Sequence, residues 1–153
     1  MMRFPRLCFL LLLGAVAALR ADQAMPAGEW DSVTIEPVKT SIYIGSVTLS
    51  TSEFRRSGDE FTATYEAKVW PWFWWNESGH ITIQLPAADL ARLARSERVE
   101  FKGEAFNQKN HPRHVSGHAD RTREGAGKIK VRIAVDGTEL IFNSTYRVNN
   151  VFR

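Results

Sequence analysis

The sequence predicts an all-β domain, an antiparallel β-sandwich or a small β-barrel, with one short helix around residues 86–96. Three observations predict it. Apolar and polar residues alternate in several segments, short turn motifs separate these segments, and a single stretch consists of helix formers. Sandwiches and barrels bury alternate residues in the same way, so the pattern does not choose between them.

The clearest strand signal lies near the C-terminus. Apolar residues occupy every second position from Ile129 to Val135, and the dipeptide Asp136-Gly137 that follows favours a type I′ hairpin turn. The return strand is expected over residues 138–148. A two-residue turn then sets the expected pairs as Val135 with Thr138, Ile133 with Leu140 and Val131 with Phe142.

A second hairpin is predicted over residues 41–69. Residues 41–54 are rich in β-branched and aromatic side chains, residues 55–59 are interpreted as a turn, and residues 60–69 alternate strictly. The face expected to be buried is Phe61, Ala63, Tyr65, Ala67 and Val69. Further strands are expected at 32–38, 80–85, 98–106 and 114–119.

The helix is predicted because Pro86 opens a run of helix formers that ends at Ser96. Its apolar residues Ala87, Leu90, Leu93 and Ala94 fall on one stripe, which indicates an amphipathic helix lying across a sheet.

Residues 1–21 predict a signal peptide, and residues 22–153 a single β-rich domain. Arg3 and Arg6 precede thirteen uncharged residues, Leu7–Leu19, and small residues follow. A membrane-spanning helix needs about 20 apolar residues, so an uncleaved anchor is the less favoured alternative. The protein is therefore expected to be secreted or periplasmic, with no transmembrane helix in the mature chain.

The charge of the mature chain argues against nucleic-acid binding. The full sequence has 20 Lys and Arg against 17 Asp and Glu, and the signal peptide carries away three arginines and no acid. The remainder is neutral, whereas nucleic-acid binding needs excess positive charge.

The single cysteine, Cys8, also lies in the signal peptide, so neither a disulfide nor a thiolate metal site is expected, and no cofactor is predicted.

The most unusual feature is the run Trp70-Pro71-Trp72-Phe73-Trp74-Trp75. If the alternation of residues 60–69 continues, Trp70, Trp72 and Trp74 form an exposed ledge of indoles about 7 Å apart. Such a ledge suits a sugar ring, a lipid surface or a protein partner. The alternative, favoured because large aromatics are mostly buried, is structural packing: Pro71 ends or bulges the strand and turns the tryptophans inward, or the helix covers them.

A basic stretch follows at residues 105–132, with seven Lys or Arg and two acids. It is interpreted as a solvated loop, with an anionic surface as a second possibility in which Arg113 and His114 would make contact. A metal site is not predicted, since His114 and His118 would lie about 13 Å apart on a strand.

One short motif resembles a known family. Gly28-Glu29-Trp30 is similar to the Gly-x-Trp that opens the first strand of lipocalins. The resemblance implies an up-and-down barrel that holds an apolar ligand, with Arg147 in the last strand placed to pack on Trp30. The chain departs from that family in its shorter mature length and in a helix within the strand series.

These observations favour an exported, non-catalytic binding or interaction module whose candidate site residues are Trp70, Trp72, Trp74, Arg113 and His114. Two alternatives stay open. One is a small barrel carrying an apolar ligand. The other is a secreted hydrolase whose acid pair the sequence does not identify. Glu53, Glu60, Glu66 and Glu104 are candidates only because they are carboxylates on predicted strands.

Overall fold

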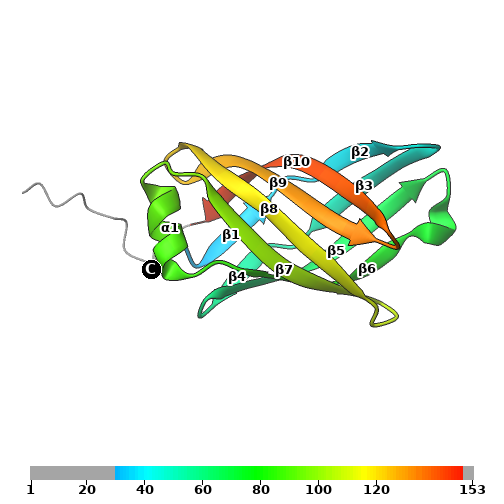
Figure 1. The fold of residues 1–153 in the computed structure, drawn as a ribbon, viewed down its shortest axis with the longest axis horizontal. Coiled ribbons are helices and arrows are strands. Elements are labelled where there is room, and N and C mark those ends of the chain that lie inside the picture. Colours follow the sequence, from blue (N-terminus) through cyan, green and yellow to red (C-terminus); the bar gives the residue numbers. More distant parts are fainter. Residues whose placement is uncertain (1–29, 150–153) are drawn as a thin grey trace, which may run out of the picture.

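The computed structural model describes residues 30–149, which form a closed antiparallel barrel with one short helix (Figure 1). The predicted signal peptide lies outside the described residues and stays a prediction. The strands are β1 (Ser32–Ile35), β2 (Val38–Ile42), β3 (Gly45–Thr51), β4 (Phe54–Ser57), β5 (Glu60–Trp70), β6 (Glu77–Gln84), β7 (Val99–Asn107), β8 (Pro112–Arg123), β9 (Ala126–Val135) and β10 (Thr138–Asn149). The helices are α1 (Ala87–Ala94) and the 3-10 helix η2 (Phe73–Trp75).

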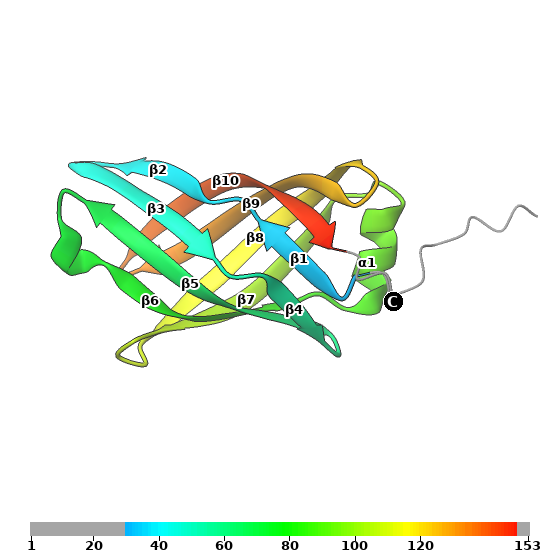
Figure 2. The ribbon, with the colours of Figure 1, turned by 180° about the vertical axis from the view of Figure 1, so that it is seen from behind.

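The strand pairing decides between the two predicted architectures. Eight strands follow one another around the ring in the order β5-β4-β1-β10-β9-β8-β7-β6, and β6 pairs back onto β5. This closure makes the fold a barrel and removes the free edges that a sandwich would leave. The β2–β3 hairpin lengthens the wall beyond β1 and β4, as the view from behind shows (Figure 2).

The C-terminal hairpin is confirmed in its register. Val135 pairs with Thr138, Ile133 with Leu140 and Val131 with Phe142. Asp136 and Gly137 have φ angles of 48° and 81°, so both occupy the left-handed region that a type I′ turn requires. The local turn chemistry and the apolar alternation therefore act together in this hairpin.

The second hairpin differs from its prediction at two places. Residues 41–54 are not one strand, because the chain turns at Tyr43-Ile44 between β2 and β3. Strand-favouring residues occupy this turn, so local propensity concealed it. Gly45 follows the turn, where a Cβ atom would come within 2.0 Å of the Trp70 carbonyl oxygen. The later turn is also shorter than expected, because β4 continues to Ser57.

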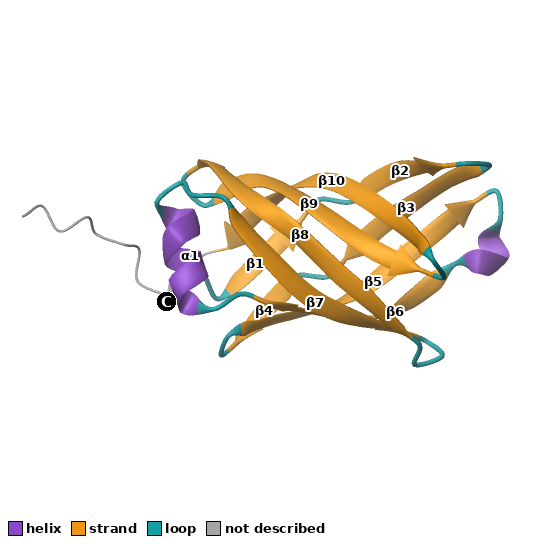
Figure 3. Ribbon diagram, viewed as in Figure 1, coloured by secondary structure: helices purple, strands orange, loops and turns teal. Residues whose placement is uncertain are grey.

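The barrel interior is packed at one end and hollow at the other. Helix α1, predicted over 86–96, covers the packed end and buries Leu90 and Leu93 (Figure 3). Large inward side chains fill the space beneath it, among them Trp30, Phe54, Phe61, Phe101 and Tyr146. At the opposite end the inward positions hold smaller residues such as Val47, Ala67, Val69 and Ala105. The short side chains among the wall residues at this end help to leave space inside the barrel.

Candidate functional site

The hollow end encloses a cavity of about 690 Å³. The cavity wall is mainly apolar and comes from strands that lie far apart in the sequence. Its apolar side chains include Ile42, Val47, Leu49, Ala67, Val69, Ile81, Ile133, Val135, Leu140 and Phe142. A volume of several hundred Å³ with an apolar wall is the size and chemistry of small-molecule sites in proteins.

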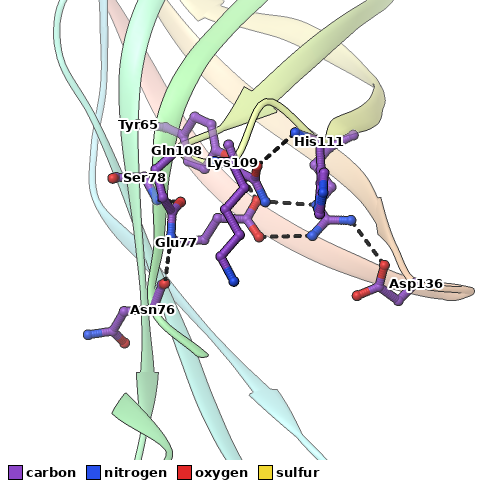
Figure 4. A network of polar contacts seen from close by, with 10 residues as sticks. Tyr65, Asn76, Glu77, Ser78, Gln108, Lys109, His111 and Asp136 are labelled. Atoms are coloured by element: carbon purple, nitrogen blue, oxygen red, sulfur yellow. Dashed lines mark hydrogen bonds and ion pairs between the residues drawn. The ribbon is translucent and has the colours of Figure 1, made fainter. Parts of the chain in front are cut away.

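A buried ion pair is the main polar feature of the cavity (Figure 4). The Nε and Nη2 atoms of Arg113 donate to the two carboxylate oxygens of Glu77 at 3.2 and 3.0 Å. The Tyr65 hydroxyl donates to the same carboxylate at 2.7 Å, and Arg113 Nη1 also donates to Asp136 at 3.1 Å. The side chains of Arg113 and Glu77 are only 11% and 18% exposed, so the pair is shielded from solvent.

The network sets the ionisation of its members. Burial alone would raise the pKa of Glu77, but hydrogen bonds from Arg113, Tyr65 and Asn107, together with the charge of Arg113, outweigh it and hold that pKa below its usual value. Burial and the bond to Glu77 raise the pKa of Tyr65 above its usual value. Glu77 is therefore a carboxylate and Tyr65 a neutral phenol at neutral pH.

The loop between β7 and β8 is fixed against this network. Asn107 Oδ1 accepts hydrogen bonds from the backbone amides of Lys109 and His111 at 3.0 and 2.8 Å. Gln108 Oε1 accepts one from the amide of Ser78 on β6 at 3.0 Å. These bonds hold one side of the cavity mouth in a defined conformation.

The structure separates Arg113 from His114. The interpretation of residues 105–132 as a solvated basic loop is wrong, because they comprise the end of β7, all of β8 and most of β9. Adjacent strand residues point to opposite faces. Arg113 therefore lies inside the barrel, neutralised by Glu77, whereas His114 is exposed on the outer wall. They do not form a common anionic site. Within residues 30–149 no group of three or more His, Cys, Asp or Glu side chains is arranged to hold a metal ion.

The aromatic run lies at the rim of the cavity rather than along a strand. β5 ends at Trp70, and residues 73–75 form η2, so Trp70, Trp72 and Trp74 do not make the evenly spaced ledge. Trp70 and Trp74 are exposed, and Trp72 is half-buried. The alternative prediction, that the tryptophans are buried, is also wrong for Trp70 and Trp74. Helix α1, which was expected to cover them, lies at the other end of the barrel (Figure 3). Trp74 and Trp75 contribute to the cavity lining.

Sequence reasoning missed Glu77 and Asp136 as site residues, although a signal for Glu77 existed. Extending the buried positions Ile83 and Ile81 back through Gly79 reaches Glu77, but the strand was predicted to begin only at residue 80. Asp136 was assigned to the turn alone. Its contact with Arg113 joins β8 to the β9–β10 turn and depends on the register of β8 against β9, which was not predicted.

Comparisons with protein-family models, with curated proteins and with solved structures give no match for this chain. The barrel that the lipocalin resemblance implies is present, but the expected packing of Arg147 on Trp30 is not. Trp30 is buried and packs against Tyr146 with ring centroids 6.5 Å apart, while Arg147 points outward and pairs with Glu36 at 2.5 Å. No helix in the described part of the chain has the length and apolar character needed to cross a membrane.

Proposed function

We propose that this protein is an exported binding protein that holds an uncharged apolar ligand inside its barrel. The observation that carries the proposal is the mainly apolar cavity of about 690 Å³ at the open end. Wall side chains such as Leu140 and Val69 are only partly buried where they line the cavity, so an apolar ligand would add van der Waals contacts to them. A chain of CH₂ or methyl groups would recover about 0.8 kcal/mol for each CH₂ buried.

The ion pair indicates the charge of the ligand. Arg113 is neutralised by Glu77 and Asp136, so it offers no unpaired positive charge to a carboxylate or phosphate inside the cavity. An anionic ligand beside Arg113 would be repelled by the two carboxylates that already pair with it, those of Glu77 and Asp136. An uncharged molecule, with at most a small polar end near the Tyr65–Glu77–Arg113 network or near the exposed Lys109 at the mouth, fits this wall.

Binding is favoured over the two other functions that the sequence left open. The carboxylate in the cavity, Glu77, does not suit the role of a glycosidase acid, because such an acid needs a raised pKa and the pKa of Glu77 is lowered. A flat sugar-binding ledge needs coplanar rings, whereas Trp72 and Trp74 meet at 70°. Export rests on the predicted signal peptide and is part of the proposal.

The test compares two neighbouring substitutions on β5. Ala67→Phe places an aromatic ring in the cavity, and Lys68→Phe places the same ring on the outer wall. We expect Ala67→Phe to weaken binding of the neutral fluorescent probe phenylnaphthylamine at least about tenfold, which corresponds to losing roughly two buried CH₂ contacts. Lys68→Phe is expected to bind like the wild type.

Val135→Phe serves as a second cavity variant, and circular dichroism establishes that each variant is folded. Mass spectrometry of an organic extract of the protein from its own host is expected to reveal a co-purified apolar molecule. Equal probe affinity in the wild type and both cavity variants would contradict binding inside the barrel.

A further inference from the structure

Large apolar side chains protrude together beside the cavity mouth. Of the eight exposed large hydrophobic residues in the described chain, six lie in two adjacent segments, the β2–β3 turn and residues 70–75. We call this surface the aromatic tip, and it consists of Tyr43, Ile44, Trp70, Phe73, Trp74 and Trp75, which are 54–107% exposed. Residues scattered singly on a surface need no explanation, but a contiguous group of this kind marks an interaction site.

The aromatic tip is held in place rather than collapsed onto the barrel. The indole nitrogen of Trp72 donates to the carbonyl oxygen of Ile44 at 3.3 Å and so joins the two segments. The Val69 amide donates to Asn76 Oδ1 at 2.8 Å, which fixes the return of the chain into β6. Neighbouring rings meet edge to face, Phe73 with Trp74 at 76° and Trp74 with Trp75 at 72°. The structure therefore presents these rings to the surroundings.

The charge distribution favours a lipid surface as the partner. Residues 40–52 and 69–76 contain no Asp, Glu, Lys or Arg, so the aromatic tip can leave water without desolvating a charge. Tryptophan and tyrosine are the residues that the bilayer–water interface accepts best. A protein-binding surface normally combines such rings with arginine and a polar rim, which the two segments lack.

The position of the aromatic tip relative to the cavity adds a second argument. Tyr43, Ile44, Trp74 and Trp75 belong both to the aromatic tip and to the lining of the cavity. An apolar surface is therefore continuous from the outside of the molecule to the interior of the barrel. We propose that the aromatic tip docks the open end of the barrel on a phospholipid bilayer, with the cavity mouth facing the lipid.

Docking rests on the aromatic tip alone, while passage of a ligand from the bilayer into the cavity rests on the proposed function.

The test measures co-sedimentation with phosphatidylcholine vesicles. The protein used lacks residues 1–21, because that apolar run would itself bind lipid, and every strand of the barrel lies within residues 30–149. We expect Phe73→Ala and Trp74→Ala each to weaken vesicle binding on the order of tenfold.

Phe106→Ala is the matched control, because Phe106 is exposed on the wall strand β7 outside the aromatic tip. It is expected to bind vesicles like the wild type. Brominated phospholipids are expected to quench the tryptophan emission of the wild type. Since the aromatic tip carries no charge, added salt should change the affinity little.

Several results would overturn docking on a bilayer. One is a wild type that does not sediment with vesicles, and another is equal binding by Phe73→Ala and Trp74→Ala. Self-association lost in the aromatic-tip variants would assign the surface to a second copy of the chain, and oligosaccharide binding lost in them would assign it to a glycan. Ala67→Phe distinguishes the two proposals, because it should lose the probe and keep vesicle binding. Phe73→Ala should lose vesicle binding and keep the probe, because Phe73 lies outside the cavity lining.

Discussion

Replacing Arg113 by methionine tests the ion pair of the cavity most directly. Methionine keeps an unbranched side chain of comparable reach and removes the charge together with all three hydrogen bonds to Glu77 and Asp136. Glu77 then remains as a shielded carboxylate, 18% exposed, with Tyr65 and Asn107 as its remaining hydrogen-bonding side chains among residues 30–149. The variant should therefore be less stable because of the charge that stays behind.

The expected magnitude follows from the exposure of each partner. Breaking a buried pair by removing one member costs about 3–5 kcal/mol, and the position at a cavity mouth places this pair near the lower end, at about 3 kcal/mol. Loss of the contact to Asp136 adds little, since that side chain is 83% exposed and such pairs contribute about 0–1 kcal/mol. The double variant Glu77→Gln/Arg113→Met removes both charges and retains an acceptor for Tyr65. It should recover about 2 kcal/mol of the loss.

The assay is urea unfolding followed by far-ultraviolet circular dichroism. His114→Met is the control, because His114 is exposed beside Arg113 on the same strand, and its change should stay within about 0.5 kcal/mol. A double variant at least as unstable as Arg113→Met would refute the reasoning. The loss would then come from packing of the arginine side chain and not from an unpaired carboxylate.

Two further predictions concern acid stability and the closed end. Since the folded state lowers the pKa of Glu77 below 4.5, its contribution to the free energy of unfolding is complete above that pH and is lost as the pH falls further. Urea midpoints measured from about pH 6 to about pH 3 should therefore converge for the wild type and Glu77→Gln, and a constant difference would contradict this origin. Leu93→Ala should cost about 2–5 kcal/mol, because Leu93 is 2% exposed beneath α1. Ala88→Ser on the exposed side of that helix should change the unfolding free energy by less than about 0.5 kcal/mol, and equal losses would show that α1 does not seal the barrel.

Local patterns predicted the elements whose causes are local. The β9–β10 hairpin was predicted in full because Asp136-Gly137 supplies the φ angles of its turn and the alternation from Ile129 fixes the buried face. The turn at Tyr43-Ile44 was missed because both residues favour strands and the turn is stabilised by distant groups, including the Trp72 indole. The path of residues 70–75 was missed in the same way, since it depends on contacts with Ile44 and Asn76.

The candidate site was only partly predictable. Trp70, Trp72, Trp74 and Arg113 lie at or near the cavity mouth, but the roles expected of them changed. Arg113 points inward because β8 begins at Pro112, before the predicted start at residue 114, and Arg113 shares the inner face with Val115. Its partner Glu77 is 36 residues away in the chain, a separation that no local pattern bridges.

The sequence by itself determined which residues face inward in β5 and in the β9–β10 hairpin, and where one helix interrupts the strands. These properties follow from the alternation of neighbouring side chains and from turn chemistry, which act over a few residues. Only the tertiary structure decided that β6 returns to β5 and closes a barrel, that short side chains from separate strands surround one cavity, and that the aromatic tip lies at its mouth. Those facts depend on which strands pair across the chain, and the energy that selects this pairing comes from contacts between residues distant in sequence.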